Sequence, residues 1–525
     1  MNHRNSEDPF SIRRFSATTH TAQSQKRLSM TKPSDTTLSY LAIGSASFYL
    51  PLTFWASNAW DIGNPTFILL YGTGVSLVGM AAFWLLSKTR ARDLSAALSI
   101  SLSLMVLMSW QRLPLRQTVL SLLLLAATVF IVVRVGPSIQ RGIAAAIVLL
   151  FGVAAVAQVT ISHALEAAEI PLLALTAREP ADATEVIEDV LVVVVDSYPS
   201  LAWANQRFGH DTSFIELSLE DAGFTTPAVG WSQHSNTSFS VSALMEMKPI
   251  VDAYSKDPWS NSRNLGSIIG GENLVASTLR SAGFQQIQIE SGWHLGQCSR
   301  TDVCIEASWL NETTWSLLEP SVIGGWLEAE YGSWIVPASK SVEARLHELR
   351  PVFGNGEHDY VFAHVMLPHG PYVVDSTCNT VPPHTNGNTV PDSAIRSQLS
   401  CTDLVLSRII EVTNETTAVL ITSDHGVKST GQLQKSPDSW TKEDIADAFT
   451  ILLSYRLPES CDPPGYNTNT IVMSAIVECA TTFDAPFNDG DLLIGLRHHS
   501  WIGPLSQREI ELGLASGRSM GEVNG

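Results

Sequence analysis

Residues 190–196 read VLVVVVD, a run of mostly β-branched apolar side chains that ends in a carboxylate. Such a continuous apolar run is typical of a strand buried on both faces, as in a parallel sheet between two layers of helices. Similar patterns predict two further strands and three helices, with the strands at 360–366 and 418–422 and the helices at 212–222, 274–282 and 402–412. Strands that alternate with helices in this way predict an α/β domain with a mainly parallel sheet.

A second apolar run ends in two side chains that are hard to bury. Residues 420–426 read LITSDHG, so Asp424 and His425 directly follow a predicted strand, as Asp196 follows the first one. In open α/β sheets the carboxyl ends of the strands face one crevice. Carboxylate and imidazole groups are ligands that a divalent cation takes there. The sequence therefore predicts one metal site between the two strand ends.

The first third of the chain has a different composition. Five runs contain no Asp, Glu, Lys or Arg, at 38–60, 66–87, 94–110, 118–133 and 142–162. Each is close to the roughly 17–25 residues that cross a bilayer, with the third and fourth at the short end. Five such runs in series do not fit a cleaved signal peptide or the core helices of a soluble protein. We expect five transmembrane helices over 37–162, preceded by a disordered cytoplasmic tail at 1–36.

Positive charges predict the orientation of these helices. Residues 1–162 hold 13 Lys and Arg against 5 Asp and Glu, and most of the 13 lie before the first run or in the loops at 88–92 and 134–141. Loops rich in Lys and Arg stay in the cytoplasm, although Arg112 and Arg116 lie in a loop on the other side. The N-terminus is then cytoplasmic, in a multi-pass cell-membrane protein. A juxtamembrane helix and linker at 163–188 and a catalytic domain at 189–525 follow outside the cytoplasm.

The charge and the cysteines of the exported part agree with this placement. Residues 163–525 hold 19 Lys and Arg against 46 Asp and Glu, which argues against binding to nucleic acid or broadly to anionic lipid. The exported part also contains all six cysteines, as expected for disulfides in an oxidising compartment. Proximity in sequence suggests the pairs Cys298–Cys304, Cys378–Cys401 and Cys461–Cys479, although six cysteines allow 15 pairings.

A polar turn and a histidine loop supply further candidate residues. Residues 235–244 read SNTSFSVSAL, a polar turn that enters a helix, and a hydroxyl of this stretch could be a fourth metal ligand and a nucleophile. The alternative for this stretch is ordinary N-capping. Residues 362–372 read FAHVMLPHGPY, which places His364 and His369 where they could bind a leaving oxygen or give it a proton. The remaining loop histidines are expected to be solvated, with His234 the least certain because it lies close to Thr237: His210, His234, His294, His498 and His499.

Four motifs follow one another behind the five apolar runs: the strand that ends at Asp196, the turn at 235–244, the histidine loop at 362–372 and the Ser-Asp-His-Gly sequence at 423–426. In this order they resemble the alkaline phosphatase/sulfatase superfamily. The similarity is greatest to its membrane-bound branch, which includes lipoteichoic acid synthases and lipid A phosphoethanolamine transferases. The resemblance implies a covalent phospho-intermediate on Thr237, and His364 and His369 in contact with the substrate phosphate or the leaving group. The ligands that it implies for one Zn²⁺ or Mn²⁺ are Asp196, Thr237, Asp424 and His425.

Three departures from the family pattern narrow the expected reaction. Ser197 stands where true sulfatases have a second Asp, Asp196 stands where many membrane relatives have Glu, and no Cys-x-Pro-x-Arg or Ser-x-Pro-x-Arg occurs. Without a formylglycine precursor, sulfate-ester hydrolysis by the usual route is not expected. The expected function is a monomeric phosphotransferase that moves a phospho-head-group, of glycerol phosphate or phosphoethanolamine type, from a lipid to an envelope glycan or lipid.

Two other functions stay open at this point. A membrane-anchored hydrolase (phosphodiesterase, phosphatase or atypical sulfatase) would use water in place of the acceptor. A catalytically inactive envelope sensor or scaffold is the third, and the complete set of metal ligands argues against it.

Overall fold

The computed structural model describes residue 40, residues 66–87 and, with gaps, residues 187–505. The gaps are at 251–264, 307, 309, 320–321, 384–389, 432–434, 436–438, 465–466, 484–492 and 498–499. Of the five predicted membrane spans, only the one at 66–87 lies in the described part, where it forms helix α2 (Thr66–Ser87). Among the described residues, no helix meets the combined length and apolarity needed to cross a membrane. The tail at 1–36, the other four spans and nearly all of the linker at 163–188 lie outside the described residues.

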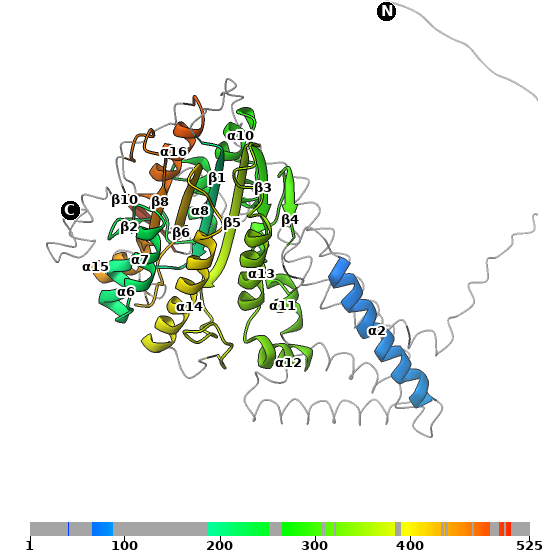
Figure 1. Ribbon diagram of the computed structural model, residues 1–525. Helices are drawn as coiled ribbons and strands as arrows, with labels where there is room; N and C mark the ends of the chain where they lie inside the picture. The colour runs from blue at the N-terminus through cyan, green and yellow to red at the C-terminus, as the bar shows by residue number, and fades with distance from the viewer. Residues whose placement is uncertain are drawn as a thin grey trace, which may run out of the picture.

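A six-stranded sheet forms the centre of the described α/β domain (Figure 1). Its order is β4 (Val303–Ile305), β3 (Gln285–Ile289), β5 (Asp359–Pro368), β1 (Asp189–Asp196), β6 (Thr417–Ser423) and β8 (Leu453–Arg456). All neighbouring pairs are parallel except β6 and β8. The predicted mainly parallel sheet is therefore confirmed, and the strand that reads VLVVVVD is one of its two central strands.

Helices cover both faces of the sheet (Figure 1). The odd-numbered side chains of β1, from Leu191 to Val195, belong to a core shared with residues of α13 and α14. The even-numbered ones, from Val190 to Val194, belong to a second core with α8, α10 and α16. The bounds of these helices are α13 Ile335–Glu348, α14 Asp392–Ile410, α8 Thr237–Glu246, α10 Leu274–Ser281 and α16 Asn469–Ala480. Every residue of β1 is buried because both of its faces are covered.

The remaining described elements are short and lie around this sandwich. They are α6 Leu201–Phe208, α7 Ser213–Asp221, β2 Gly230–Trp231, η2 His294–Gly296, α11 Glu312–Leu318, α12 Val322–Tyr331, α15 Lys442–Phe449, β7 Thr450–Ile451, β9 Leu493–Arg497 and β10 Ser500–Leu505. The helices predicted at 212–222 and 274–282 correspond to α7 and α10 within one residue at each end.

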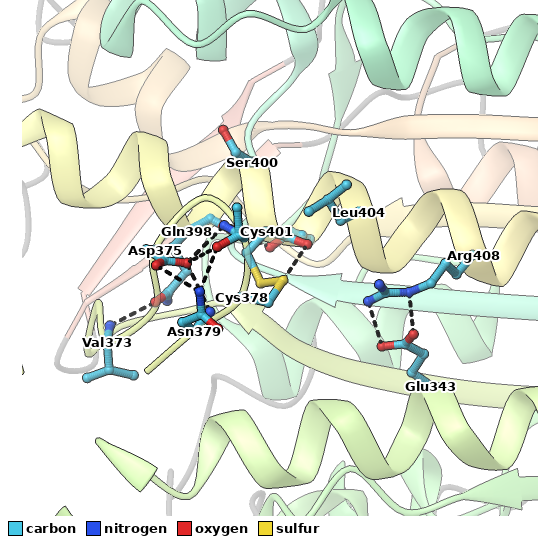
Figure 2. The surroundings of a disulfide bond; sticks show 12 residues. Glu343, Val373, Asp375, Cys378, Asn379, Gln398, Ser400, Cys401, Leu404 and Arg408 are labelled. Carbon is cyan, nitrogen blue, oxygen red and sulfur yellow. Dashed lines mark hydrogen bonds and ion pairs between the residues drawn. A yellow bond between two sulfur atoms is a disulfide. The ribbon is translucent and has the colours of Figure 1, made fainter. Parts of the chain in front are cut away.

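The prediction for α14 is wrong at its start, because this helix begins at Asp392 and not at residue 402. Polar residues fill its first half, and this hid the apolar face of Ala394, Ile395 and Leu399, all of which are buried. The three disulfides suggested by proximity, on the other hand, are all formed. Cys378–Cys401 ties the loop after β5 to α14 (Figure 2).

Candidate active site

The carboxyl ends of β1 and β6 bring together the three side chains predicted to hold a metal. The two strands are parallel neighbours and Val195 pairs with Ser423, so Asp196 and Asp424 leave the sheet at the same level. Asp196, Asp424 and His425 are each 1% exposed. One ligand atom from each of the three lies within 4.8 Å of the others, which is close enough for a single ion to contact all of them.

The hydrogen bonds of His425 fix which ring nitrogen carries the proton. Its Nδ1 lies 2.7 Å from the carbonyl oxygen of Gly426, and because a carbonyl can only accept, Nδ1 donates. Burial lowers the pKa of His425 to about 3, so the ring is neutral and Nε2 holds a lone pair. That nitrogen lies 3.2 Å from Oδ2 of Asp424, a buried oxygen that has no hydrogen-bond partner. Two lone pairs that face each other at this distance fit a cation bound between them.

The two buried carboxylates have different protonation preferences. Burial alone would raise the pKa of Asp424, but the neighbouring His425 and His364 outweigh burial and hold it below its ordinary value. Burial and the charge on Asp424 raise the pKa of Asp196 to about 7. A divalent cation would remove the repulsion between these two groups. The donor set of two carboxylates and one imidazole therefore fits a divalent metal ion.

Two serines align these ligands. The amide of Ser197 donates to Oδ1 of Asp424 at 2.9 Å, and its hydroxyl donates to Oδ1 of Asp196 at 2.9 Å. Ser197 has a φ of 66°, in the left-handed region that non-glycine residues rarely adopt. The hydroxyl of Ser240, on α8, donates to the backbone carbonyl of Asp424 at 2.5 Å. The sequence identified Ser197 only as a departure from the family pattern, and these contacts show that it orients both carboxylates.

Thr237 is the first residue of α8, and its hydroxyl faces the candidate metal ligands. Its Oγ1 lies 3.2 Å from Nε2 of His425, and the side chain is partly exposed. The alternative reading of this stretch as an N-cap applies to its neighbour, because the Asn236 side chain accepts the amide hydrogen of Ser238 at 3.1 Å. The Thr237 hydroxyl is thus not used as the helix cap.

His364 and His369 lie near the two carboxylates; His364 is on β5, and His369 is on the loop that follows it. His364, on β5, is buried, neither of its ring nitrogens has a hydrogen-bond partner, and its Nε2 lies 3.7 Å from Oδ2 of Asp196. Burial lowers the pKa of His364 to about 4, so its ring is neutral. His369 is partly exposed and close enough to lower the pKa of Asp196.

The loop that carries His369 is held by a buried glutamine on α14. Nε2 of Gln398 donates to the carbonyl oxygens of Pro368 and His369, at 3.0 and 2.8 Å, and its Oε1 accepts from the amide of Val373 at 2.9 Å. Figure 2 shows Gln398 next to the Cys378–Cys401 disulfide, which fastens the same loop to the same helix. The amphipathic pattern of α14 gave no sign of this role.

The loop after His425 is packed tightly against α15. A Cβ on Gly426 would lie 2.1 Å from the carbonyl oxygen of Asp447, so no other residue fits without a shift. The buried Asp447 carboxylate accepts from the amides of Ser429 and Thr430 and from the indole nitrogen of Trp203. These bonds fix the path of the chain for five residues beyond His425.

Lys428 is a site residue that the sequence did not single out. Its Nζ lies 3.1 Å from Nε2 of His425 and donates to the carbonyl oxygen of Ser235 at 2.9 Å. Burial lowers the pKa of this ammonium, while Asp424 and Asp196 oppose the shift. Loop lysines are usually solvated, so the position of Lys428 in the site becomes visible only from the folded path of the loop.

Two of the histidines expected to be solvated are buried instead. His210 is 1% exposed, and its Nε2 lies 2.8 Å from Oδ2 of Asp403, whose other oxygen accepts from the Tyr198 hydroxyl at 2.5 Å. His234 is 0% exposed, and its Nε2 accepts from the amide of Ile250 at 3.2 Å. Both therefore act as hydrogen-bonded core residues. Of the other three, His498 and His499 lie outside the described residues, and the side chain of His294 is not described.

No protein-family model matches this chain, and no curated protein matches it. Among solved structures, it is similar to an integral membrane lipooligosaccharide phosphoethanolamine transferase from Neisseria meningitidis, at 13% identity, over 81% of this chain and 76% of that one, with a TM-score of 0.39. It is also similar to the periplasmic domain of EcEptC from Escherichia coli in complex with Zn, at 13% identity, over 57% and 84% of the two chains, with a TM-score of 0.38. A third is an alkaline phosphatase superfamily protein from Vibrio parahaemolyticus, at 11% identity, over 59% and 71%, with a TM-score of 0.37.

Proposed function

We propose that this chain is a membrane-anchored, metal-dependent phosphotransferase with Thr237 as its nucleophile. One observation carries the proposal. The Thr237 hydroxyl lies 3.2 Å from the His425 nitrogen whose lone pair faces the unpartnered oxygen of Asp424. A hydroxyl beside an incomplete, buried set of metal ligands is the arrangement that a nucleophile activated by a metal requires.

The metal would be a divalent ion, Zn²⁺ or Mn²⁺, held by Asp196, Asp424, His425 and Thr237. The unpartnered Oδ2 of Asp424 and the lone pair on Nε2 of His425 support this assignment. When bound, such an ion lowers the pKa of a hydroxyl that it contacts. Ser197, which donates to both carboxylates, keeps their oxygens turned toward the site.

In the first step the Thr237 oxygen attacks the phosphorus of a lipid head group. A bond forms between Oγ1 and phosphorus, and the bond from phosphorus to the lipid alcohol breaks. The hydroxyl proton passes to water, and His369 gives a proton to the departing alcohol and regains one from solvent. In the second step an acceptor hydroxyl on an envelope glycan or lipid attacks the phosphorus, so that a bond from the acceptor oxygen to phosphorus forms and the bond from Oγ1 to phosphorus breaks. The acceptor loses its proton to solvent, and the Thr237 oxygen takes one up.

In this scheme the neutral, buried His364 would form a hydrogen bond to the substrate and would not act as a general acid. Its ring nitrogens have no hydrogen-bond partner inside the protein, so the one that carries a hydrogen can donate a bond to an oxygen of the substrate phosphate. The membrane anchor is proposed from the sequence, because five charge-free runs at 38–162 would place a lipid donor beside the site.

A hydrolase remains the second candidate, for one specific reason. The Thr237 side chain is partly exposed, so water could reach a phosphothreonine as readily as an acceptor hydroxyl. Transferase and hydrolase differ only in the group that completes the second step. Product analysis with a lipid phosphodiester, with and without an acceptor glycan, separates them. Products that never contain the acceptor would assign the chain as a hydrolase.

The test of the nucleophile compares two neighbouring hydroxyls. Thr237→Ala is expected to abolish turnover of the lipid donor while the protein still binds its metal. Ser238→Ala is the matched control, because that hydroxyl bonds only to the exposed Asn236 side chain, at 2.6 Å, and its loss should leave most of the activity. Wild-type turnover in the Thr237→Ala protein would remove the nucleophile assignment.

A further inference from the structure

Lys428 is a charged side chain inside the candidate site for which the scheme above has no use. It belongs to the loop after β6, and its Nζ lies 3.1 Å from Nε2 of His425. The Thr237 hydroxyl lies 3.2 Å from the same nitrogen. Lysine ammonium groups are seldom turned inward, and neither the Ser235 carbonyl nor the neutral His425 ring balances the charge of this one, so its position beside the proposed nucleophile needs an explanation.

The protein holds Lys428 in an unfavourable backbone conformation. Its φ is 58°, in the left-handed region that residues with a side chain rarely adopt. The conformation is fixed from outside, because the amide of Lys428 donates to the carbonyl of Asp447 at 3.2 Å and the Asp447 carboxylate accepts from the next two amides. The buried Asp447 therefore directs the ammonium group toward His425.

The distances bring the Lys428 ammonium within reach of a phosphoryl group bonded to Thr237. Nζ of Lys428 and Oγ1 of Thr237 both lie within hydrogen-bond distance of Nε2 of His425. They are therefore separated by no more than the sum of those two distances, 6.3 Å. A phosphorus bonded to Oγ1 carries oxygens that reach about one bond length further. An ammonium then donates to such an oxygen at about 2.7–2.9 Å. An ammonium this close to Oγ1 is therefore within reach of an oxygen on a phosphorus bonded to Oγ1.

The hydrogen bond from Lys428 to His425 is available only while the site holds no cation. Nε2 has one lone pair, and a bound cation would use it. Lys428 then keeps its bond to the Ser235 carbonyl and has a donor left for a new acceptor on the Thr237 side. A nonbridging phosphoryl oxygen is such an acceptor, and it becomes more negative as the Oγ1–phosphorus bond forms.

We propose that Lys428 is a further catalytic residue, which donates a hydrogen bond to a nonbridging oxygen of the phosphoryl group attacked by Thr237. This inference rests on the proposed function and extends it to the class of substrate, which must present an anionic phosphoryl oxygen at this point. No proton is transferred by Lys428. Its positive charge stabilises the oxygen while the Oγ1–phosphorus bond forms and the bond to the lipid alcohol breaks.

The test measures binding of inorganic phosphate by calorimetry, in the full chain loaded with metal. Thr237→Ala is the background, so that no covalent product forms. Adding K428Q is expected to weaken phosphate binding at least tenfold, while K428R keeps most of the affinity because it keeps the charge. K340Q is the matched control, since Lys340 is exposed on α13 and its loss removes the same charge without touching the site. If K428Q does not fold, Lys428→Gly, which suits the left-handed backbone, replaces it with the same expectation.

Two results would overturn the assignment. The first is that the double variant, K428Q added to Thr237→Ala, binds phosphate as tightly as Thr237→Ala alone while it still holds one equivalent of metal. The second is loss of the metal itself from K428Q, since Lys428 would then support the metal site and not the substrate. With Thr237 intact, K428Q should also lower kcat/KM for a phosphodiester by about 10²–10³-fold. Failure of the proposed function would appear elsewhere, as activity retained by Thr237→Ala, so the two failures are distinguishable.

Discussion

Asp424→Asn should make the metal-free protein more stable and the metal-loaded protein less stable than the wild type. Oδ1 of Asp424 accepts from the amides of Ser197 and His425, at 2.9 and 2.8 Å, so the asparagine oxygen will keep that position. The new NH₂ group then takes the place of Oδ2, which lies 3.2 Å from the lone pair on Nε2 of His425. The substitution removes an acceptor that has no partner, and it removes the repulsion that helps to raise the pKa of Asp196 to about 7.

The substitution changes the free energy of unfolding in opposite directions in the metal-free and the metal-loaded protein. Removing a buried, unpartnered charged oxygen and its repulsion with Asp196 is worth about 1–3 kcal/mol, which the metal-free variant gains. A metal ion at 1,000 times its dissociation constant stabilises the wild type by about 4 kcal/mol. Asp424→Asn loses most of that term, because it removes one of the two charged ligands. The order of stability should therefore reverse when metal is added.

The assay is thermal and denaturant unfolding of the purified full chain in a chelator and in excess Zn²⁺ or Mn²⁺. Asp392→Asn is the control, since it removes the same charge from an exposed ion pair with Arg207 at 3.0 Å. It should change stability by less than about 1 kcal/mol, equally in both conditions. The reasoning is refuted if Asp424→Asn is less stable than the wild type in chelator, or if metal stabilises both proteins to the same extent.

Three further predictions concern the loop, the far end of the sheet and the metal. Gly426→Ala should destabilise the protein by about 1–3 kcal/mol and weaken metal binding, as measured by unfolding and by metal titration, because the new Cβ would lie 2.1 Å from the Asp447 carbonyl oxygen; an unchanged protein would contradict the packing. Burial and the nearby Asp189 raise the pKa of Asp359 from 3.8 to about 6, so the folded state loses stability as the pH rises from 4 through 6. Asp359→Asn should therefore be about 1–3 kcal/mol more stable than the wild type at pH 8 and no more stable at pH 4; a gain that does not depend on pH would count against this explanation. Elemental analysis after metal loading should find about one equivalent of metal per chain, and much less in Asp196→Asn; equal metal contents would argue against the site.

The parts of the fold that the sequence predicted are those with a strong local pattern. A run such as VLVVVVD has few alternatives to a strand buried on both faces, and β1 forms as expected. Asp196 and Asp424 could be placed together because parallel strands end at one edge of the sheet. Cysteine pairs close in sequence leave little loop to order, and all three suggested pairs form.

The parts that were missed depend on contacts between distant segments. Lys428 looks like a solvated loop residue until Asp447, 19 positions further on, turns the loop back toward the site. His210 looks like another one until Asp403 of α14 packs against it. The early start of α14 was hidden because half of its first turns face water. In each case the deciding partner lies far away in sequence, where no local pattern can report it.

The central claim is that Thr237 receives the phospho-group, and its most direct test is peptide mass spectrometry of the protein quenched in acid during turnover of a lipid phosphodiester. The peptide that contains residues 235–244 should gain the mass of the transferred phospho-group, with fragment ions that place it on Thr237. The same peptide from Thr237→Ala should gain nothing. A wild-type peptide that stays unmodified while the donor is consumed, or a modification on Ser238 or Ser240, would contradict the account.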